Sequence, residues 1–139
     1  MKVLFVCRGN VGRSQMAEVI FNSLSDVGHE ALSAGTQVRE NEGQRIGDRL
    51  SATYVIDVLN EIGIDAKNNT RTQLTEDNLK AADVVVSMAE TDTLPDFLVN
   101  HAETIYWDLA DPFEQSLEFT RNTRNRITEL VKDLLSRMH

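Results

Sequence analysis

The 139-residue chain is predicted to be an α/β protein: a single three-layer domain in which a four-stranded parallel sheet has helices on both faces. Short runs rich in β-branched residues alternate with amphipathic segments, which is typical of parallel strands joined by crossover helices. No internal repeat or low-complexity linker divides the sequence. A chain of this length with 41% apolar residues can bury a proper core. We therefore expect residues 1–139 to form one domain.

The chain opens with a predicted strand, loop and helix. Residues 2–6, KVLFV, are continuously apolar and β-branched, as expected for a strand buried on both faces. Residues 7–13, CRGNVGR, form a predicted loop, because its two glycines and its asparagine can adopt positive φ. Ser14 is expected to cap a helix over residues 14–24.

The rest of the chain continues the alternation. Apolar residues spaced by three and four predict a helix over residues 46–62, and Gly63 lies where a left-handed C-terminal cap is expected. The same spacing predicts a final helix over residues 127–138. The other predicted elements are strands at residues 29–33, 83–87 and 103–107 and a short helix that starts at Thr75. In such a sheet, ligands bind at the carboxyl ends of the strands, where the strand order reverses.

Cys7 is the only cysteine, and it starts the loop that follows the first strand. A lone cysteine forms no internal disulfide, so it is either a small buried residue or a reactive thiol. The helix after the loop points unpaired N–H groups and the positive end of its dipole back at Cys7. Backbone N–H groups can converge beside the glycines to form an anion-binding nest. This environment suits a phosphate-sized oxyanion and also stabilises a thiolate.

Two side chains of the same stretch complete this chemistry. Arg13 supplies a planar fork of donors that grips two oxygens of an oxyanion at once. Ser14 is placed to donate a hydrogen bond to a departing thiolate. Arg8 either lies at the mouth of the site, where it favours acidic ligands, or is an ordinary solvated arginine. The predicted oxyanion contacts come from the loop and the first residues of the helix: Arg8, Gly9, Asn10, Val11, Gly12, Arg13 and Ser14.

Charge and composition exclude several classes of function. The net charge of −8 opposes nucleic-acid binding, which needs a basic face. No segment approaches the roughly 20 apolar residues of a membrane span, so no membrane partner and a cytoplasmic location are expected. His29, His101 and His139 lack ligand spacing, so neither a metal nor another cofactor is expected. We expect a monomer or weak dimer.

The chemistry-bearing residues resemble a known family. Cys7, Asn10, Arg13 and Ser14 fill the CxxNxxRS loop of the low-molecular-weight protein tyrosine phosphatases and of the arsenate reductases that share their fold. Further family-like stretches extend along nearly the whole chain: SAGT at residues 33–36, EIGID at residues 61–65, AADVVVSM at residues 81–88 and DP at residues 111–112. The resemblance implies the phosphatase fold and a phosphate monoester or other oxyanion as substrate, including phosphotyrosine in proteins.

The resemblance also implies a role for each residue. Cys7 would attack phosphorus and form a cysteinyl-phosphate, while Arg13 and the loop N–H groups hold the equatorial oxygens. Asp111 would protonate the leaving oxygen and then activate the water that hydrolyses the intermediate. Asp108, three residues earlier, is a rival for this acid role.

Residues outside the reacting groups have implied supporting roles. Asn10, in a left-handed conformation, would hold the shape of the loop. Ser33 would brace Asn10 and Ser14 from the second strand. Residues 37–47, where many eukaryotic relatives carry an aromatic residue that sandwiches the phenyl ring, contain none.

Three functions remain open. The first is hydrolysis of phosphotyrosine or of small aryl phosphate monoesters. The second is arsenate reduction with an external thiol, since a reductase that shuttles an internal disulfide needs two further cysteines. The third is an inactive module that binds phosphate groups.

Overall fold

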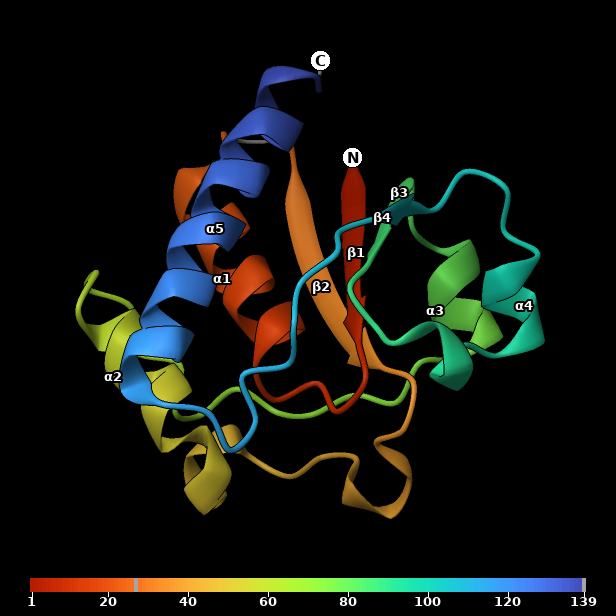
Figure 1. The fold of residues 1–139 in the computed structure, drawn as a ribbon. Coiled ribbons are helices and arrows are strands. Elements are labelled where there is room, and N and C mark those ends of the chain that lie inside the picture. Colours follow the sequence, from red (N-terminus) through yellow and green to blue (C-terminus); the bar gives the residue numbers. More distant parts are fainter. Residues whose placement is uncertain (27, 139) are drawn as a thin grey trace.

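The computed structural model describes residues 1–26 and 28–138. The expectation that His139 is not a metal ligand therefore lies outside the described residues. Four parallel strands form one sheet in the order β2-β1-β3-β4, which confirms the predicted sheet (Figure 1). The strands are β1 (Lys2–Cys7), β2 (Glu30–Gly35), β3 (Val84–Ser87) and β4 (Ile105–Tyr106). The α-helices are α1 (Arg13–Leu24), α2 (Thr53–Asn60), α3 (Glu76–Lys80), α4 (Asp96–Val99) and α5 (Leu117–Ser136). The 3-10 turns are η1 (Arg39–Asn41), η2 (Ile46–Asp48), η3 (Leu50–Ala52) and η4 (Thr91–Thr93).

Side chains of β1 alternate between the two layers of helices. Val3, Phe5 and Cys7 join the apolar cluster formed with α1, α2 and α5. Leu4 and Val6 join a second cluster that contains residues of α3 and α4. Figure 1 shows these two sets of helices on opposite faces of the sheet. Because successive side chains of a strand point to opposite faces, a continuous apolar run is the pattern that a doubly covered strand requires.

The predicted N-cap of the first helix is wrong. Helix α1 begins at Arg13, and Gly12 occupies the N-cap position without a side-chain capping bond. Ser14 lies inside the first turn and is fully buried. Its hydroxyl contacts Cys7 and Asn10 instead of a backbone N–H group of the helix.

The predicted continuous helix over residues 46–62 is also wrong. The segment consists of η2 and η3 followed by the shorter α2, and Leu50, assigned to the apolar stripe, is 92% exposed. The N–H of Gly47 bonds to the carbonyl of Lys67 at 2.9 Å. This crossing with a neighbouring segment holds the backbone outside a regular helix. Gly63 has a φ of +80°, which confirms the predicted left-handed cap.

The last helix is longer than the predicted 127–138. Helix α5 begins after Ser116, whose hydroxyl accepts a hydrogen bond from the N–H of Phe119 at 3.0 Å. Its first half escaped prediction because it buries polar side chains. Arg124, for example, bonds to the carboxylate of Glu61 at the end of α2. Among the described residues, no helix combines the length and apolar character that crossing a membrane requires.

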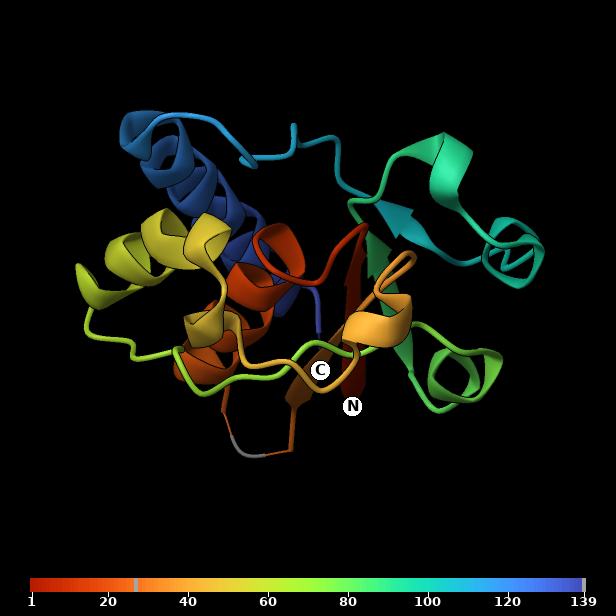
Figure 2. The same cartoon turned by 90° about the horizontal axis from the view of Figure 1, so that it is seen from below.

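The strand order places two loops at one end of the sheet. The chain passes from β1 to β2 on one side and later to β3 on the other, so the loop after β1 (residues 8–12) lies where the order reverses. Strand β4 covers only two residues of the predicted 103–107. The segment after β4, residues 107–116, runs past the same end of the sheet. Figure 2 looks onto this end and shows the loop after β1 with that segment and residues 36–52 around it.

Candidate active site

The site begins with the thiol of Cys7 at the end of β1. Cys7 is buried and lies on the same face of the strand as Val3 and Phe5. The period of two along the strand therefore directs the thiol toward the first turn of α1. There its Sγ lies 2.9 Å from the hydroxyl oxygen of Ser14.

A chain of hydrogen bonds continues from that contact, in which the Ser14 hydroxyl is the donor whenever Cys7 is a thiolate, because a thiolate can only accept. The Asn10 side-chain amide donates to the hydroxyl oxygens of Ser14, at 2.7 Å, and of Ser33, at 3.0 Å. Because the Ser14 oxygen already accepts from Asn10, its proton is available to the sulfur of Cys7. Ser33 in turn donates to Glu18 at 3.1 Å. Asn10 has a φ of +53°, the left-handed conformation expected from the resemblance.

Glu18 closes this network, and sequence reasoning missed it. Burial raises the pKa of the Glu18 carboxyl, and the hydrogen bond from Ser33 opposes that shift. Glu18 follows Ser14 by four residues, so both lie on one face of α1, which is the signal that could have revealed it. The Asn10 side-chain oxygen also accepts from the backbone N–H of Thr72 at 2.8 Å. The loop is therefore held from α1, from β2 and from the segment that precedes α3.

The guanidinium of Arg13 is buried and has four partners. One nitrogen donates to the carbonyls of Met88, at 2.5 Å, and of Leu109, at 2.9 Å. The other donates to the carboxylate of Glu90 at 2.7 Å and lies 3.7 Å from that of Asp111. Arg13 is thus oriented by the segments that follow β3 and β4. No sequence signal singled out Glu90.

Asp111 lies at the mouth of the site in the segment between β4 and α5. The N–H of Phe113 donates to one carboxylate oxygen at 3.0 Å, while the other oxygen faces Arg13. Pro112 packs against the loop after β1, since a Cβ added to Gly12 would lie 3.2 Å from its ring. The acid-bearing segment therefore rests directly on the loop that follows Cys7.

These side chains enclose a pocket of about 380 Å³. Cys7, Arg13 and Asp111 all line it, while Asp108 is exposed and does not. Of the predicted loop contacts, Arg8, Gly9, Val11 and Gly12 also line the pocket, whereas Asn10 and Ser14 lie behind the loop and support it.

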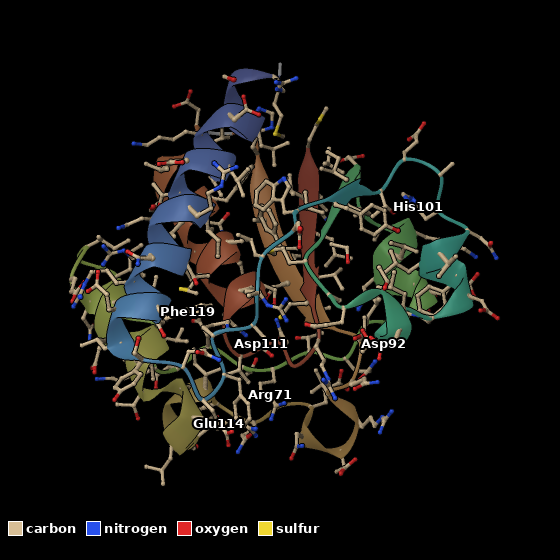
Figure 3. The ribbon with its side chains drawn as sticks, viewed as in Figure 1. Arg71, Asp92, His101, Asp111, Glu114 and Phe119 are labelled. Carbon is tan, nitrogen blue, oxygen red and sulfur yellow. The ribbon has the colours of Figure 1, made fainter. Side chains whose placement is uncertain are left out.

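Residues that sequence reasoning missed complete the walls of the pocket. Tyr54 and Phe113 supply aromatic surface, so the lack of aromatic residues at positions 37–47 does not leave the pocket without it. Arg39, Arg49 and Arg71 add positive charge. Figure 3 shows Arg71 and Asp111 at the same end of the sheet. These residues come from separate segments, so no local pattern in the sequence connects them.

Within residues 1–26 and 28–138, no three His, Cys, Asp or Glu side chains gather into a group that could hold a metal ion. The site is built from a thiol, hydroxyl groups, guanidinium groups and carboxylates. A thiol beside hydrogen-bond donors and positive charge is a combination that suits nucleophilic attack at a bound oxyanion.

A parallel sheet with order 2-1-3-4, a cysteine that begins its first loop, and an aspartate-proline pair facing that loop define the class of low-molecular-weight cysteine phosphatases and their relatives. The chain belongs to the family described as low molecular weight phosphotyrosine protein phosphatase, whose model matches residues 2–139.

Individual relatives within this family have different activities in their names. The glutaredoxin arsenate reductase of Synechocystis sp. is 32% identical over 138 residues, with 99% of this chain and 98% of the relative covered. The protein-arginine-phosphatase of Bacillus subtilis is 27% identical over 155 residues, covering 99% and 97%. The crystal structure of a low molecular weight protein tyrosine phosphatase from T. tengcongensis matches with a TM-score of 0.85 and 31% identity, covering 99% of both chains. The chain is therefore a cysteine phosphatase or an arsenate reductase of this family.

Proposed function

We propose that the protein is a cysteine-dependent phosphatase that hydrolyses phosphotyrosine or small aryl phosphate monoesters. The observation that carries the proposal is the shared pocket: the Cys7 thiol lies at its base and the Asp111 carboxyl at its mouth. Tyr54 and Phe113 offer the aromatic surface against which a phenyl ring packs.

In the first step, the Cys7 thiolate attacks phosphorus, so that a sulfur–phosphorus bond forms as the bond to the leaving oxygen breaks. Asp111 transfers its proton to that oxygen, which departs as a phenol. The N–H groups of the loop after β1 stabilise the charge on the three equatorial oxygens. The guanidinium of Arg13, whose terminal nitrogens donate to Met88, Leu109 and Glu90, adds its positive charge beside them. Asn10 and Ser33 keep the loop in the required shape.

In the second step, water attacks the cysteinyl-phosphate. Asp111, now a carboxylate, accepts the proton of the water, and the sulfur–phosphorus bond breaks to release inorganic phosphate. The hydroxyl of Ser14 donates to the departing sulfur of Cys7, which stabilises the thiolate. Cys7 is thus the nucleophile of the first step and the leaving group of the second, and Asp111 is first the acid and then the base.

The positive charge of the pocket favours an aryl phosphate over phosphoarginine as the substrate. A phosphorylated guanidinium group carries its own positive charge into the pocket. Arg13 is paired with the carboxylate of Glu90. The lining also holds the carboxylate of Asp111 and four arginines without a carboxylate partner among the described residues: Arg8, Arg39, Arg49 and Arg71. Like charges in a confined pocket repel, and such repulsion is one way that a site discriminates between substrates. The activity named for the Bacillus subtilis relative is for this reason the less favoured one.

Arsenate reduction is the second candidate, favoured by the 32% identity to a named arsenate reductase. Cys7 would displace water from arsenate and form a sulfur–arsenic bond. An external thiol would then attack the sulfur of Cys7, so that arsenite leaves with the electron pair and a mixed disulfide remains. A second external thiol would release Cys7. Two thiols are oxidised as arsenic(V) becomes arsenic(III), which suits a chain with one cysteine.

One assay panel decides between these functions. The purified protein is given p-nitrophenyl phosphate, a phosphotyrosine peptide, a phosphoarginine peptide, and arsenate with glutathione and glutaredoxin. We expect release of phosphate from the first two, and its loss in Cys7→Ser. Arsenite production without phosphatase turnover would select the reductase. Binding of inorganic phosphate with neither activity would leave the inactive binding module.

A further inference from the structure

The arginines of the described chain fall into two groups by partner and by place. One group has a carboxylate within 4.0 Å of the guanidinium: Arg13, Arg45, Arg121, Arg124, Arg126 and Arg137. In the other group, no described carboxylate lies within that distance, and every member lines the pocket: Arg8, Arg39, Arg49 and Arg71. We call this second group the arginine rim. In a chain with a net charge of −8, uncompensated positive charge is thus concentrated at one opening.

The hydrogen bonds of the arginine rim leave its charge uncompensated, because their acceptors are neutral. Arg8 donates to the side-chain oxygen of Gln37 at 3.0 Å. Arg49 donates to the hydroxyl of a serine two residues later at 2.6 Å. Arg71 is buried and donates to the carbonyl of Gly9 at 3.0 Å, directly on the loop after β1. These bonds position the guanidinium groups and leave other donors of each free for a ligand.

Two further observations connect the arginine rim with the functional site. Burial lowers the pKa of Arg71, the charge of Arg49 lowers it further, and Cys7 raises it, so the three groups lie in one electrostatic field. Arg39 is held at a φ of +56°, a conformation that costs a non-glycine residue free energy. Strained residues of this kind concentrate at functional sites.

The rim extends to both sides of the loop. Arg39 belongs to η1, and Arg49 joins η2 to η3. Figures 1 and 2 show the segments around η1 and around η2 and η3 on opposite sides of the loop after β1. Arg8 and Arg39 are exposed, so their charges reach beyond the pocket itself. A ligand that meets guanidinium groups on both sides must extend away from the reacting phosphate in two directions.

We propose that the arginine rim binds carboxylates on both sides of a phosphotyrosine, so that the preferred substrate is an acidic phosphopeptide. This inference rests on the proposed phosphatase activity and names its substrate class. A single oxyanion in the pocket is too small to contact the guanidinium groups on both sides of the loop after β1. A peptide with Glu residues on either side of the phosphotyrosine places a carboxylate near the guanidinium groups on each side.

The test compares two fluorescein-labelled phosphotyrosine peptides of equal length, one with Glu and one with Gln at the flanking positions. Anisotropy measures their dissociation constants with the Cys7→Ser variant. We expect the Glu peptide to bind roughly tenfold more tightly at low salt, because several partly exposed ion pairs each contribute modestly. The preference should shrink at about 0.5 M salt, where such pairs are screened.

A charge-matched pair of variants separates the rim from net charge. Arg39→Gln with Arg49→Gln should reduce the preference to roughly threefold, since part of the rim remains. Arg126→Gln with Arg137→Gln removes the same charge from α5, where each arginine has a carboxylate partner, and should leave the preference intact. Equal affinity for the two peptides, or equal loss in both double variants, would overturn the proposal.

Turnover by the wild-type protein keeps the two proposals distinguishable. If neither peptide is hydrolysed, the proposed function fails, and the binding preference measured with the wild-type chain still decides for or against the arginine rim. If both peptides are hydrolysed with equal kcat/KM and bind equally, the function stands and the arginine rim has no part in substrate selection. A higher kcat/KM for the Glu peptide supports both proposals.

Discussion

Replacing Ser14 with alanine tests the predicted hydrogen bond between its hydroxyl and the sulfur of Cys7. The hydroxyl lies 2.9 Å from the sulfur of Cys7, and its oxygen accepts from the side-chain amide of Asn10 at 2.7 Å. When Cys7 leaves as a thiolate, which can only accept, the Ser14 hydroxyl is the donor of this contact. Ser14→Ala removes the hydroxyl donor, and the side-chain amide of Asn10 keeps its second acceptor, the hydroxyl of Ser33.

The size of the effect follows from the charge on sulfur. A hydrogen bond to a charged group contributes about 1.5–3 kcal/mol net. At about 1.4 kcal/mol for each factor of ten, kcat should fall by about ten- to a hundredfold. The loss should be concentrated in breakdown of the cysteinyl-phosphate, where Cys7 departs as a thiolate.

Rapid mixing with p-nitrophenyl phosphate separates the two steps. The initial burst of nitrophenol reports formation of the intermediate, and the steady rate reports its breakdown. We expect the burst amplitude to persist in Ser14→Ala while the steady rate drops. Ser23→Ala is the matched control on the same helix, since its exposed hydroxyl donates only to the carbonyl of Ile20 at 2.8 Å. A steady rate within twofold of wild type would refute the reasoning, provided that the variant keeps the wild-type melting temperature.

Three further predictions test the acid, the packing of the loop and the ion pairs. Asp111→Asn should slow hydrolysis of phenyl phosphate, a poor leaving group, roughly a hundredfold and that of p-nitrophenyl phosphate much less; equal losses would remove Asp111 from the acid role. Gly35→Ala puts a methyl group 2.7 Å from a backbone oxygen and 2.9 Å from a backbone nitrogen of the loop after β1. Activity and stability should therefore fall together, with the free energy of unfolding lower by about 1–3 kcal/mol. Gly63→Ala is the control: Gly63 has a positive φ and open space around it, so this variant should lower only the melting temperature. The hydrogen bond from Arg121 lowers the pKa of Glu61 from 4.5 to about 2. Glu61 thus stabilises the fold above about pH 4.5 and loses this contribution as the pH falls toward 2, so the difference in melting temperature between wild type and Glu61→Gln should shrink over that range; a difference that stays constant would contradict the ion pair.

The local sequence pattern was sufficient to predict the features that depend on a single element or on residues a few positions apart. The apolar run of β1 predicts a strand covered on both faces, and Leu4 and Phe5 do pack into separate clusters. Cys7, Asn10 and Arg13 lie within seven residues of one another, so the strand, the loop and the following helix suffice to bring them together. The left-handed Asn10 and the position of Gly63 follow from backbone sterics, which act within a few residues.

Local pattern failed where distant segments compete for the same backbone or side chain. The spacing of residues 46–62 fits a helix, but hydrogen bonding of Gly47 to Lys67 holds part of that backbone in another form. Ser14 has the side chain of an N-cap, but burial beside Cys7 gives its hydroxyl a different partner. Tertiary contacts override propensity because propensities differ by only about 1 kcal/mol or less per residue.

The sequence by itself determined the α/β class, the parallel sheet and the thiol that begins its first loop, because each depends on the period of side chains along a strand or on residues a few positions apart. Only the tertiary structure decided that Glu90 holds Arg13 and that Glu18 ends the network behind Cys7. It also decided that arginines without a carboxylate partner among the described residues line the pocket. Those residues come from segments distant along the chain, and they meet only because the strand order brings several loops to one edge of the sheet.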